Sequence, residues 1–278
     1  MIISDKYEFA FIHIPKCAGS SVRNKLRYID SQASFYGAVK EHPSLGKIDY
    51  GHIPLIYLQS YFPNEYQKLG SYNTFCVIRD PYERFPSSMA QYLRMYKNLQ
   101  LSALSKKQFK GEVENLIRSL ERHANMVCLP YDLIHFQRQV SYILNGDRQV
   151  VRNIYTIENI EDLLVDLMKN AGLAIPSDDF QNFKKKINPT KVFKNNTLGY
   201  VFNIIKPFST KILKNSPWTF KGKISKHLYI KPQEKFNDIL NSEYVKDFIS
   251  EFYHDDIQFY KSKIELQQLH NDIQGAEI

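Results

Sequence analysis

The stretch FAFIHIPKCAGSS, residues 9–21, joins a short apolar run to a loop of small and polar residues. The run is too brief for a helix and ends at Pro15, which predicts a buried strand. A helix is expected after the loop, with Ser20 or Ser21 as its cap. Three apolar residues recur there at helical spacing: Val22, Leu26 and Ile29. This part of the chain therefore predicts a strand, a loop and a helix.

The same order of strand and helix recurs twice further along the chain. Residues 74–78, TFCVI, form a second apolar run, and a helical pattern follows it through Tyr96. Residues 153–157, NIYTI, form a third run before a helix that starts near Asn159. This alternation predicts an α/β fold, a P-loop-like three-layer sandwich with a central parallel sheet flanked by helices. Ligands are then expected at the carboxyl ends of the strands.

The length of the chain, 278 residues, is enough for one large domain or two small ones, and a single domain is expected. Residues 181–231 hold twelve lysines, no arginine and no acidic residue, whereas the whole chain has a net charge of +8. This segment is interpreted as an insertion or lid that closes over a nucleotide and lines a groove for an acidic acceptor; the alternative is a solvated linker. Residues 232–270 are expected to form a C-terminal helical region.

Cysteine usage and hydropathy indicate the compartment. The chain has three cysteines, Cys17, Cys76 and Cys128, which are too scattered for a disulfide framework and lack metal-ligand spacing. No apolar run reaches the roughly 18 residues that a membrane helix needs, and no secretory signal begins the chain. A soluble protein of the reducing cytoplasm is expected, without a metal site.

The loop PKCAGSS, residues 15–21, has the composition of an anion site. Small residues let the backbone approach a ligand, and the start of a helix offers free N–H groups and a positive dipole. Lys16 and the two serine hydroxyls add donors. The nucleotide-hydrolase pattern is absent, because the lysine precedes the glycine here. The alternative is a plain turn with a solvated lysine.

A second polar motif follows the second strand. Arg79 stands where open α/β sheets bind ligands. If a helix begins at Pro81, Arg84 and Ser87 share one of its faces and can converge on a second anion. A structural ion pair is an equal alternative for Arg84. Pro86 predicts a kink or a delayed helix start, because proline removes a backbone hydrogen bond.

Together these motifs resemble those of the sulfotransferases that use 3′-phosphoadenosine 5′-phosphosulfate (PAPS), in particular the carbohydrate branch with the heparan sulfate 2-O-enzymes and many bacterial relatives. The resemblance continues in GHIP at residues 51–54, HFxxQ at 135–139, IEN at 157–159 and FYxxD at 252–256. It spans most of the chain and implies a bacterial source. Cys17 and Ser20 stand where the family often has threonine.

The resemblance implies a role for each motif. The first loop would bind the 5′-phosphosulfate through Lys16, Cys17, Ala18, Gly19, Ser20 and Ser21. Arg79 and Ser87 would bind the 3′-phosphate. The expected reaction is sulfuryl transfer from PAPS to a hydroxyl group of an acceptor. The expected acceptor is a carbohydrate, and it can be an acidic one. Lys16 would stabilise the departing nucleotide, so a divalent cation is not expected.

His52 is the candidate catalytic base. Imidazole titrates close to neutrality, and a histidine just after Gly51 can face a cleft. Without the family resemblance, His52 would be better interpreted as a surface or structural histidine. Glu41 and His42 are weaker candidates, and His13 is interpreted as a strand residue that supports the loop.

Two other classes of function stay open at this point. A nucleotide or small-molecule kinase would also use a strand, an anion loop and a lysine, and it would depend on magnesium, with Asp80 as the available metal ligand. A non-catalytic protein could bind acidic glycans through the lysine-rich segment and would ignore adenosine 3′,5′-bisphosphate. No nucleic-acid-binding signature occurs, so no nucleic acid partner is expected.

Overall fold

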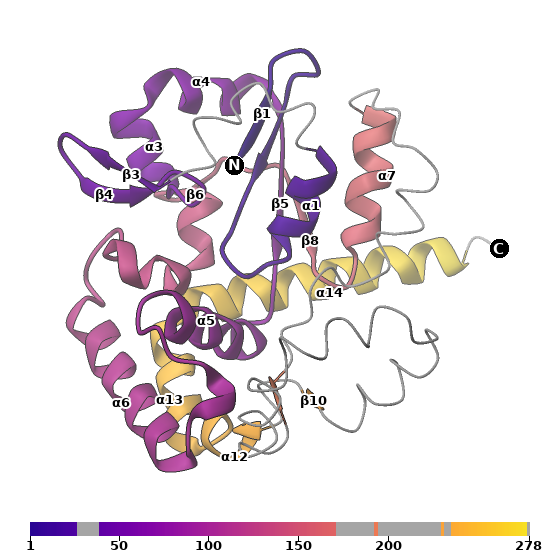
Figure 1. The fold of residues 1–278 in the computed structure, drawn as a ribbon. Helices are drawn as coiled ribbons and strands as arrows, with labels where there is room; N and C mark the ends of the chain where they lie inside the picture. Colours follow the sequence, from indigo (N-terminus) through magenta and orange to yellow (C-terminus); the bar gives the residue numbers. More distant parts are fainter. Residues whose placement is uncertain (27–38, 171–191, 194–228, 231–234, 277–278) are drawn as a thin grey trace, which may run out of the picture. The chain divides into compact units, whose positions relative to one another are not determined.

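A computed structural model describes residues 1–26, 39–170, 192–193, 229–230 and 235–276 (Figure 1). The chain divides into two compact units. Unit 1 comprises residues 1–88, 123–187 and 249–278, and unit 2 comprises residues 89–122 and 188–248. Apart from residues 192–193 and 229–230, the predicted lysine-rich lid at 181–231 lies outside the described residues.

Unit 1 contains a four-stranded sheet of order β1-β2-β5-β8. Its strands are β1 (Ile2–Ser4), β2 (Phe9–Ile12), β5 (Asn73–Ile78) and β8 (Asn153–Thr156). The three predicted strands pair in parallel, whereas β1, which the sequence analysis did not predict, pairs antiparallel with β2 at the edge. The prediction of a parallel sheet is therefore confirmed for β2, β5 and β8 and wrong for β1. The strand residues are mostly buried, which explains the uninterrupted apolar runs.

Helices flank this sheet. They include α1 (Gly19–Leu26), α4 (Pro63–Ser71), α7 (Ile160–Asn170) and α14 (His254–Ala276). Helix α4 lies against β2, and α7 and α14 lie against β8 (Figure 1). Helix α1 begins at Gly19, so the predicted caps Ser20 and Ser21 lie inside its first turn. Val22 and Leu26 are buried as the spacing predicts, and Ile29 lies outside the described residues.

Helix α5 (Pro81–Met95) starts at the first proline of the second motif. The backbone carbonyl of Asp80 accepts the N–H groups of Glu83 and Arg84 at 3.0 and 2.8 Å, and its Oδ1 accepts the N–H of Tyr82 at 2.9 Å. Asp80 therefore caps the helix, and Pro86 lies within it. The predicted delayed start is wrong, because the Asp80 cap fixes the first turn ahead of the proline.

Several short elements of unit 1 carry the remaining motifs. The hairpin β3 (Val39–His42) and β4 (Gly46–Asp49) precedes α3 (Leu55–Tyr61), and His52 stands between the hairpin and α3. The 3₁₀ helices η3 (Tyr131–Phe136) and η4 (Gln139–Tyr142) lead into a hairpin of β6 (Leu144–Asn145) and β7 (Arg148–Gln149).

Unit 2 is mainly helical where it is described. Its elements are η2 (Leu101–Ala103), α6 (Lys106–Arg122), α12 (Asn237–Leu240) and most of α13 (Glu243–Phe252), with a hairpin of β9 (Val192–Phe193) and β10 (Tyr229–Ile230). Where the structure describes it, the predicted C-terminal helical region at 232–270 consists of α12, α13 and α14. Phe109 and Phe236 stack with ring centroids 4.0 Å apart.

Lys235 hydrogen-bonds the C-terminal part of unit 2 to residues 101–104. Its Nζ donates to the carbonyls of Leu101, Ser102 and Leu104 at 3.2, 3.0 and 3.2 Å. Burial lowers the pKa of this ammonium. The three carbonyls belong to the short 3₁₀ helix η2 or directly follow it, and one ammonium donates to all of them.

We expect Lys235→Met to lower the free energy of unfolding by about 1–3 kcal/mol, because the three carbonyls lose their charged donor while the aliphatic stem is kept. Denaturant unfolding monitored by circular dichroism measures the change. The matched control is Lys246→Met, since Lys246 is exposed on α13. Equal stability of the two variants would contradict a clamping role for Lys235.

Candidate functional site

The loop after β2 has the backbone geometry of an anion site. Lys16 and Ala18 adopt positive φ values of 65° and 58°, and Cys17 between them does not. Alternation of left- and right-handed residues turns successive N–H groups into one concavity that suits an anion. The N–H groups of Gly19 and Ser20, in the first turn of α1, have no intrahelical partner. The loop thus combines two sources of N–H donors beside one lysine.

Gly19 is required by its contact with His13. A Cβ at Gly19 would lie 1.9 Å from Cδ2 of the His13 ring, a distance at which two carbon atoms cannot coexist. His13 directly follows β2 and is buried. The start of α1 therefore rests on an imidazole, in accordance with the prediction that His13 supports the loop.

Three histidines meet beside this loop. The rings of His13 and His52 have centroids 4.5 Å apart, and those of His52 and His135 have centroids 5.7 Å apart. Nδ1 of His52 lies 2.9 Å from the backbone oxygen of His13. Because a carbonyl can only accept, Nδ1 carries the proton, and in the neutral ring Nε2 keeps a free lone pair. This tautomer is the one that a general base needs.

Burial keeps the three imidazoles neutral. It lowers the pKa of His52 to about 3, although the hydrogen bond to His13 acts in the opposite direction. Burial, followed by the proximity of His52, lowers the pKa of His135 to about 3 and that of His13 well below its ordinary value. At neutral pH the cluster therefore carries no charge of its own.

Of the predicted 3′-phosphate residues, Arg79 lies just before α5 and Ser87 lies on it. Arg79 donates through Nε and Nη2 to Oε2 of Glu83, at 3.3 and 3.0 Å. Ser87 stands one turn beyond Glu83 on the same face. The Arg79 side chain is 18% exposed and that of Glu83 is 57% exposed. An anion that approached Arg79 would compete with a solvated carboxylate.

Arg84 is buried in the interior of unit 1, whereas Ser87 is half-buried. Its Nη2 lies 3.5 Å from Oδ2 of Asp256, and both side chains are at most 1% exposed. Its guanidinium also donates to the carbonyls of His135 and Gln137 at 3.5 and 3.0 Å. Of the two alternatives for Arg84, the structural ion pair is therefore the one observed.

Asp256 extends this ion pair to the first two residues of the η4 helix. Its Oδ2 accepts the N–H of Gln139 at 2.8 Å, and its Oδ1 accepts the N–H of Val140 at 3.0 Å. Burial raises the pKa of Asp256, while Arg84 and the two N–H donors oppose that shift. The carboxylate of α14 thus fixes where η4 begins.

The side chain of Gln139 connects the two candidate anion loops. Its Oε1 accepts the N–H of Arg79 at 3.0 Å and the thiol of Cys17 at 3.1 Å. Its Nε2 donates to the carbonyl of Arg79 at 2.8 Å. Sequence analysis noted Gln139 only as part of a family motif and missed this role, since it joins residues far apart in the chain.

Cys17 is a packing residue of the loop. It is buried, and burial raises the pKa of its thiol to about 12, so the nucleophilic thiolate is not populated at neutral pH. Cys76 and Cys128 are also free and buried. Within the described ranges, no group of three or more histidine, cysteine, aspartate or glutamate residues is arranged to hold a metal ion.

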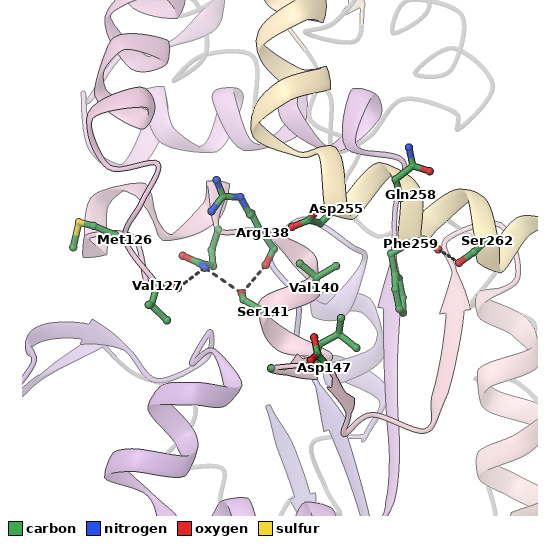
Figure 2. A pocket seen from close by; sticks show the side chains of 13 residues that line it. Met126, Val127, Arg138, Val140, Ser141, Asp147, Asp255, Gln258, Phe259 and Ser262 are labelled. Atoms are coloured by element: carbon green, nitrogen blue, oxygen red, sulfur yellow. Dashed lines mark hydrogen bonds between the residues drawn. The ribbon is translucent and has the colours of Figure 1, made fainter.

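Two cavities of unit 1 lie near the segment that holds residues 126–141. One, of about 250 Å³, has His52 in its wall. The other, of about 660 Å³, is bordered by Arg138, Asp147 and Asp255 and contains none of the predicted site residues (Figure 2). Arg138 there already donates to the carbonyls of Phe252 and Ala124 at 2.9 and 3.1 Å. The cavity at His52 is therefore the one relevant to the histidine cluster.

No helix in the described part of the chain is long and apolar enough to cross a membrane.

We expect Gln139→Glu to destabilise the protein more at pH 8 than at pH 5. The carboxylate would face the carbonyl of Arg79 where the amide now donates, whereas a protonated carboxyl can still donate. The expected loss at pH 8 is about 1–3 kcal/mol. Denaturant unfolding at both pH values measures it.

The matched control for this variant is Gln258→Glu, because Gln258 is exposed on α14. A loss of the same size at both pH values, or in both variants, would show that the amide does not bridge the loops.

Comparison with known proteins relates this geometry to one family. A family model described as the sulfotransferase family matches residues 1–262. No curated protein and no solved structure matches the chain.

Proposed function

The chain belongs to the sulfotransferase family, and from this premise we propose that it transfers a sulfuryl group from PAPS to a hydroxyl of a carbohydrate acceptor. The observation that carries the proposal is the hydrogen bond from Nδ1 of His52 to the backbone oxygen of His13. It leaves Nε2 unprotonated beside a loop whose backbone suits an anion. Base and donor site are then neighbours.

In the proposed reaction, the acceptor oxygen attacks sulfur while the bond from sulfur to the bridging oxygen of PAPS breaks. The electron pair of that bond stays on the phosphate oxygen and yields adenosine 3′,5′-bisphosphate. Nε2 of His52 takes the hydroxyl proton and later releases it to solvent. Anionic PAPS close to the ring would raise the pKa of His52 from about 3 towards neutrality, which makes it a stronger base.

The first loop would bind the 5′-phosphosulfate. Its six residues are Lys16, Cys17, Ala18, Gly19, Ser20 and Ser21, which form the proposed P-loop-like element. The N–H groups of Gly19 and Ser20 would hold the phosphate, whereas those of Cys17 and Ser21 donate to the carbonyls of Ile14 and Ala18. Lys16 would stabilise charge on the leaving oxygen. The transferred group carries less charge than a phosphoryl group, so lysine and backbone donors supply the stabilisation without a divalent cation.

Arg79 and Ser87 would bind the 3′-phosphate. Glu83 now pairs with Arg79 through a carboxylate that is 57% exposed, and solvation of the carboxylate weakens such a pair. A phosphate with two charges would displace the carboxylate at little cost. Glu83 can then turn to solvent, while Ser87 adds a hydroxyl donor from the next turn of α5.

The kinase alternative is not favoured. Asp80, its candidate metal ligand, caps α5 through the N–H of Tyr82. The glycan-binding alternative rests on residues 181–231, most of which lie outside the described residues. The family match accounts for the two motifs without either alternative.

Adenosine 3′,5′-bisphosphate is expected to raise the melting temperature in the presence of EDTA, and adenosine 5′-monophosphate much less, because only the former fills both anion loops. Thermal shift assays measure both. Arg79→Ala should weaken the response to the bisphosphate, whereas the control Arg94→Ala, at an exposed position of α5, should not. Equal stabilisation by the two nucleotides would contradict the assignment of Arg79 and Ser87.

His52→Ala is expected to lower turnover at least about a hundredfold while nucleotide affinity stays near the wild-type value, as for loss of a general base. Transfer from labelled PAPS measures turnover, and calorimetry with adenosine 3′,5′-bisphosphate measures binding. His254→Ala is the control, since His254 is exposed at the start of α14. Near-normal turnover of the His52 variant would place the base elsewhere, with Glu41 and His42 as the next candidates.

A further inference from the structure

The cavity of about 250 Å³ beside His52 is mostly apolar. Eleven of the residues that line it are apolar or aromatic, or cysteine: Leu45, Ile48, Ile53, Pro54, Tyr57, Met126, Cys128, Leu129, Pro130, Tyr131 and Ile134. The other three are Lys47, Asp49 and His52. A polar group in such a cavity must find its partners among very few side chains.

The charged residues of this cavity leave it without net charge. Lys47 and Asp49 cancel, and burial lowers the pKa of His52 to about 3, so its ring is neutral at pH 7. Both charges are also engaged: Nζ of Lys47 lies 4.8 Å from the centre of the Tyr131 ring, and Oδ1 of Asp49 accepts the N–H of Gly51 at 2.8 Å. A carboxylate placed inside would lose water, and the one lysine in the wall already lies over the Tyr131 ring and is balanced by Asp49.

The size of the cavity limits its occupant to about one ring. Pockets for drug-sized ligands measure roughly 300–1,000 Å³, and this one is smaller. Tyr57 and Tyr131 are in its wall, and tyrosine rings can contact the apolar face of a sugar ring. A ring with one apolar face and a hydroxyl at its edge matches this shape and polarity.

We propose that this cavity takes the reacting unit of the acceptor and that this unit is an uncharged ring with an apolar face, such as a neutral pyranose. The proposal rests on the proposed role of His52 as the base, because the reacting hydroxyl must then lie beside His52, in the wall of this cavity. Acidic groups of a longer acceptor, if it has them, then belong to neighbouring units outside the cavity.

The test compares two acceptors that differ by one carboxylate. Phenyl β-D-glucopyranoside and phenyl β-D-glucuronide are incubated with the full-length protein and labelled PAPS. The expected kcat/KM for the neutral glycoside is at least about tenfold higher, because only the glucuronide must bury a charge. Equal or faster transfer to the glucuronide would overturn the proposal.

A cavity-filling variant tests the location. Cys128 lines the cavity and is buried, so Cys128→Trp should lower kcat/KM for the neutral glycoside at least about tenfold. Stabilisation by adenosine 3′,5′-bisphosphate should persist, and the control Leu266→Trp, at an exposed position of α14, should stay close to wild type. Unchanged transfer by a folded Cys128→Trp variant would place the acceptor elsewhere. Should the variant fail to fold, the comparison of the two glycosides still decides.

Different results would contradict the proposed donor site and the proposed acceptor cavity. Loss of the bisphosphate response in the wild-type protein would refute the proposed donor site itself. A normal bisphosphate response without transfer to either glycoside would overturn only the assignment of the acceptor ring to this cavity.

Discussion

The buried ion pair between Arg84 and Asp256 is the constraint on which the site geometry depends. Two charges removed from water are tolerated only when every remaining donor and acceptor finds a partner. Here Arg84 also donates to the carbonyls of His135 and Gln137, and Asp256 accepts two backbone N–H groups. The ion pair thus holds α5, α14 and the segment from His135 to Val140 in one arrangement. Removal of one partner from such a pair typically costs about 3–5 kcal/mol.

That arrangement places the groups to which we assign chemistry. The segment fixed by the ion pair contributes His135 to the histidine cluster and Gln139 to the two candidate anion loops. Gln139 lies 122 residues from Cys17 in the chain and 60 from Arg79. The paired strands β2 and β5 bring the two loops together, and the Gln139 amide links them at a spacing that must match the two phosphate groups of the proposed donor.

The proposed acceptor side and the proposed donor side of the site differ in charge. The histidine cluster is neutral because burial lowers each pKa, and the cavity beside His52 has no net charge. Positive charge is concentrated at Lys16, Arg79 and the start of α1, where the proposed donor would bind. A neutral acceptor side and a cationic donor side agree with the proposed transfer from an anionic donor to an uncharged ring.

The sequence by itself determined the three parallel strands, the helices that follow them and the two polar loops, because a short apolar run, a helical period and a strand-to-helix loop are local patterns. It also led to the family that the comparison shows. Only the tertiary structure decided that β1 joins the sheet antiparallel, that Arg84 pairs with Asp256, and that Gln139 bridges both loops. Arg84 shows the reason. Helical spacing predicts on which face of α5 Arg84 lies. Whether that face is exposed to solvent or contacts a carboxylate 172 positions later depends on packing, which no local pattern encodes.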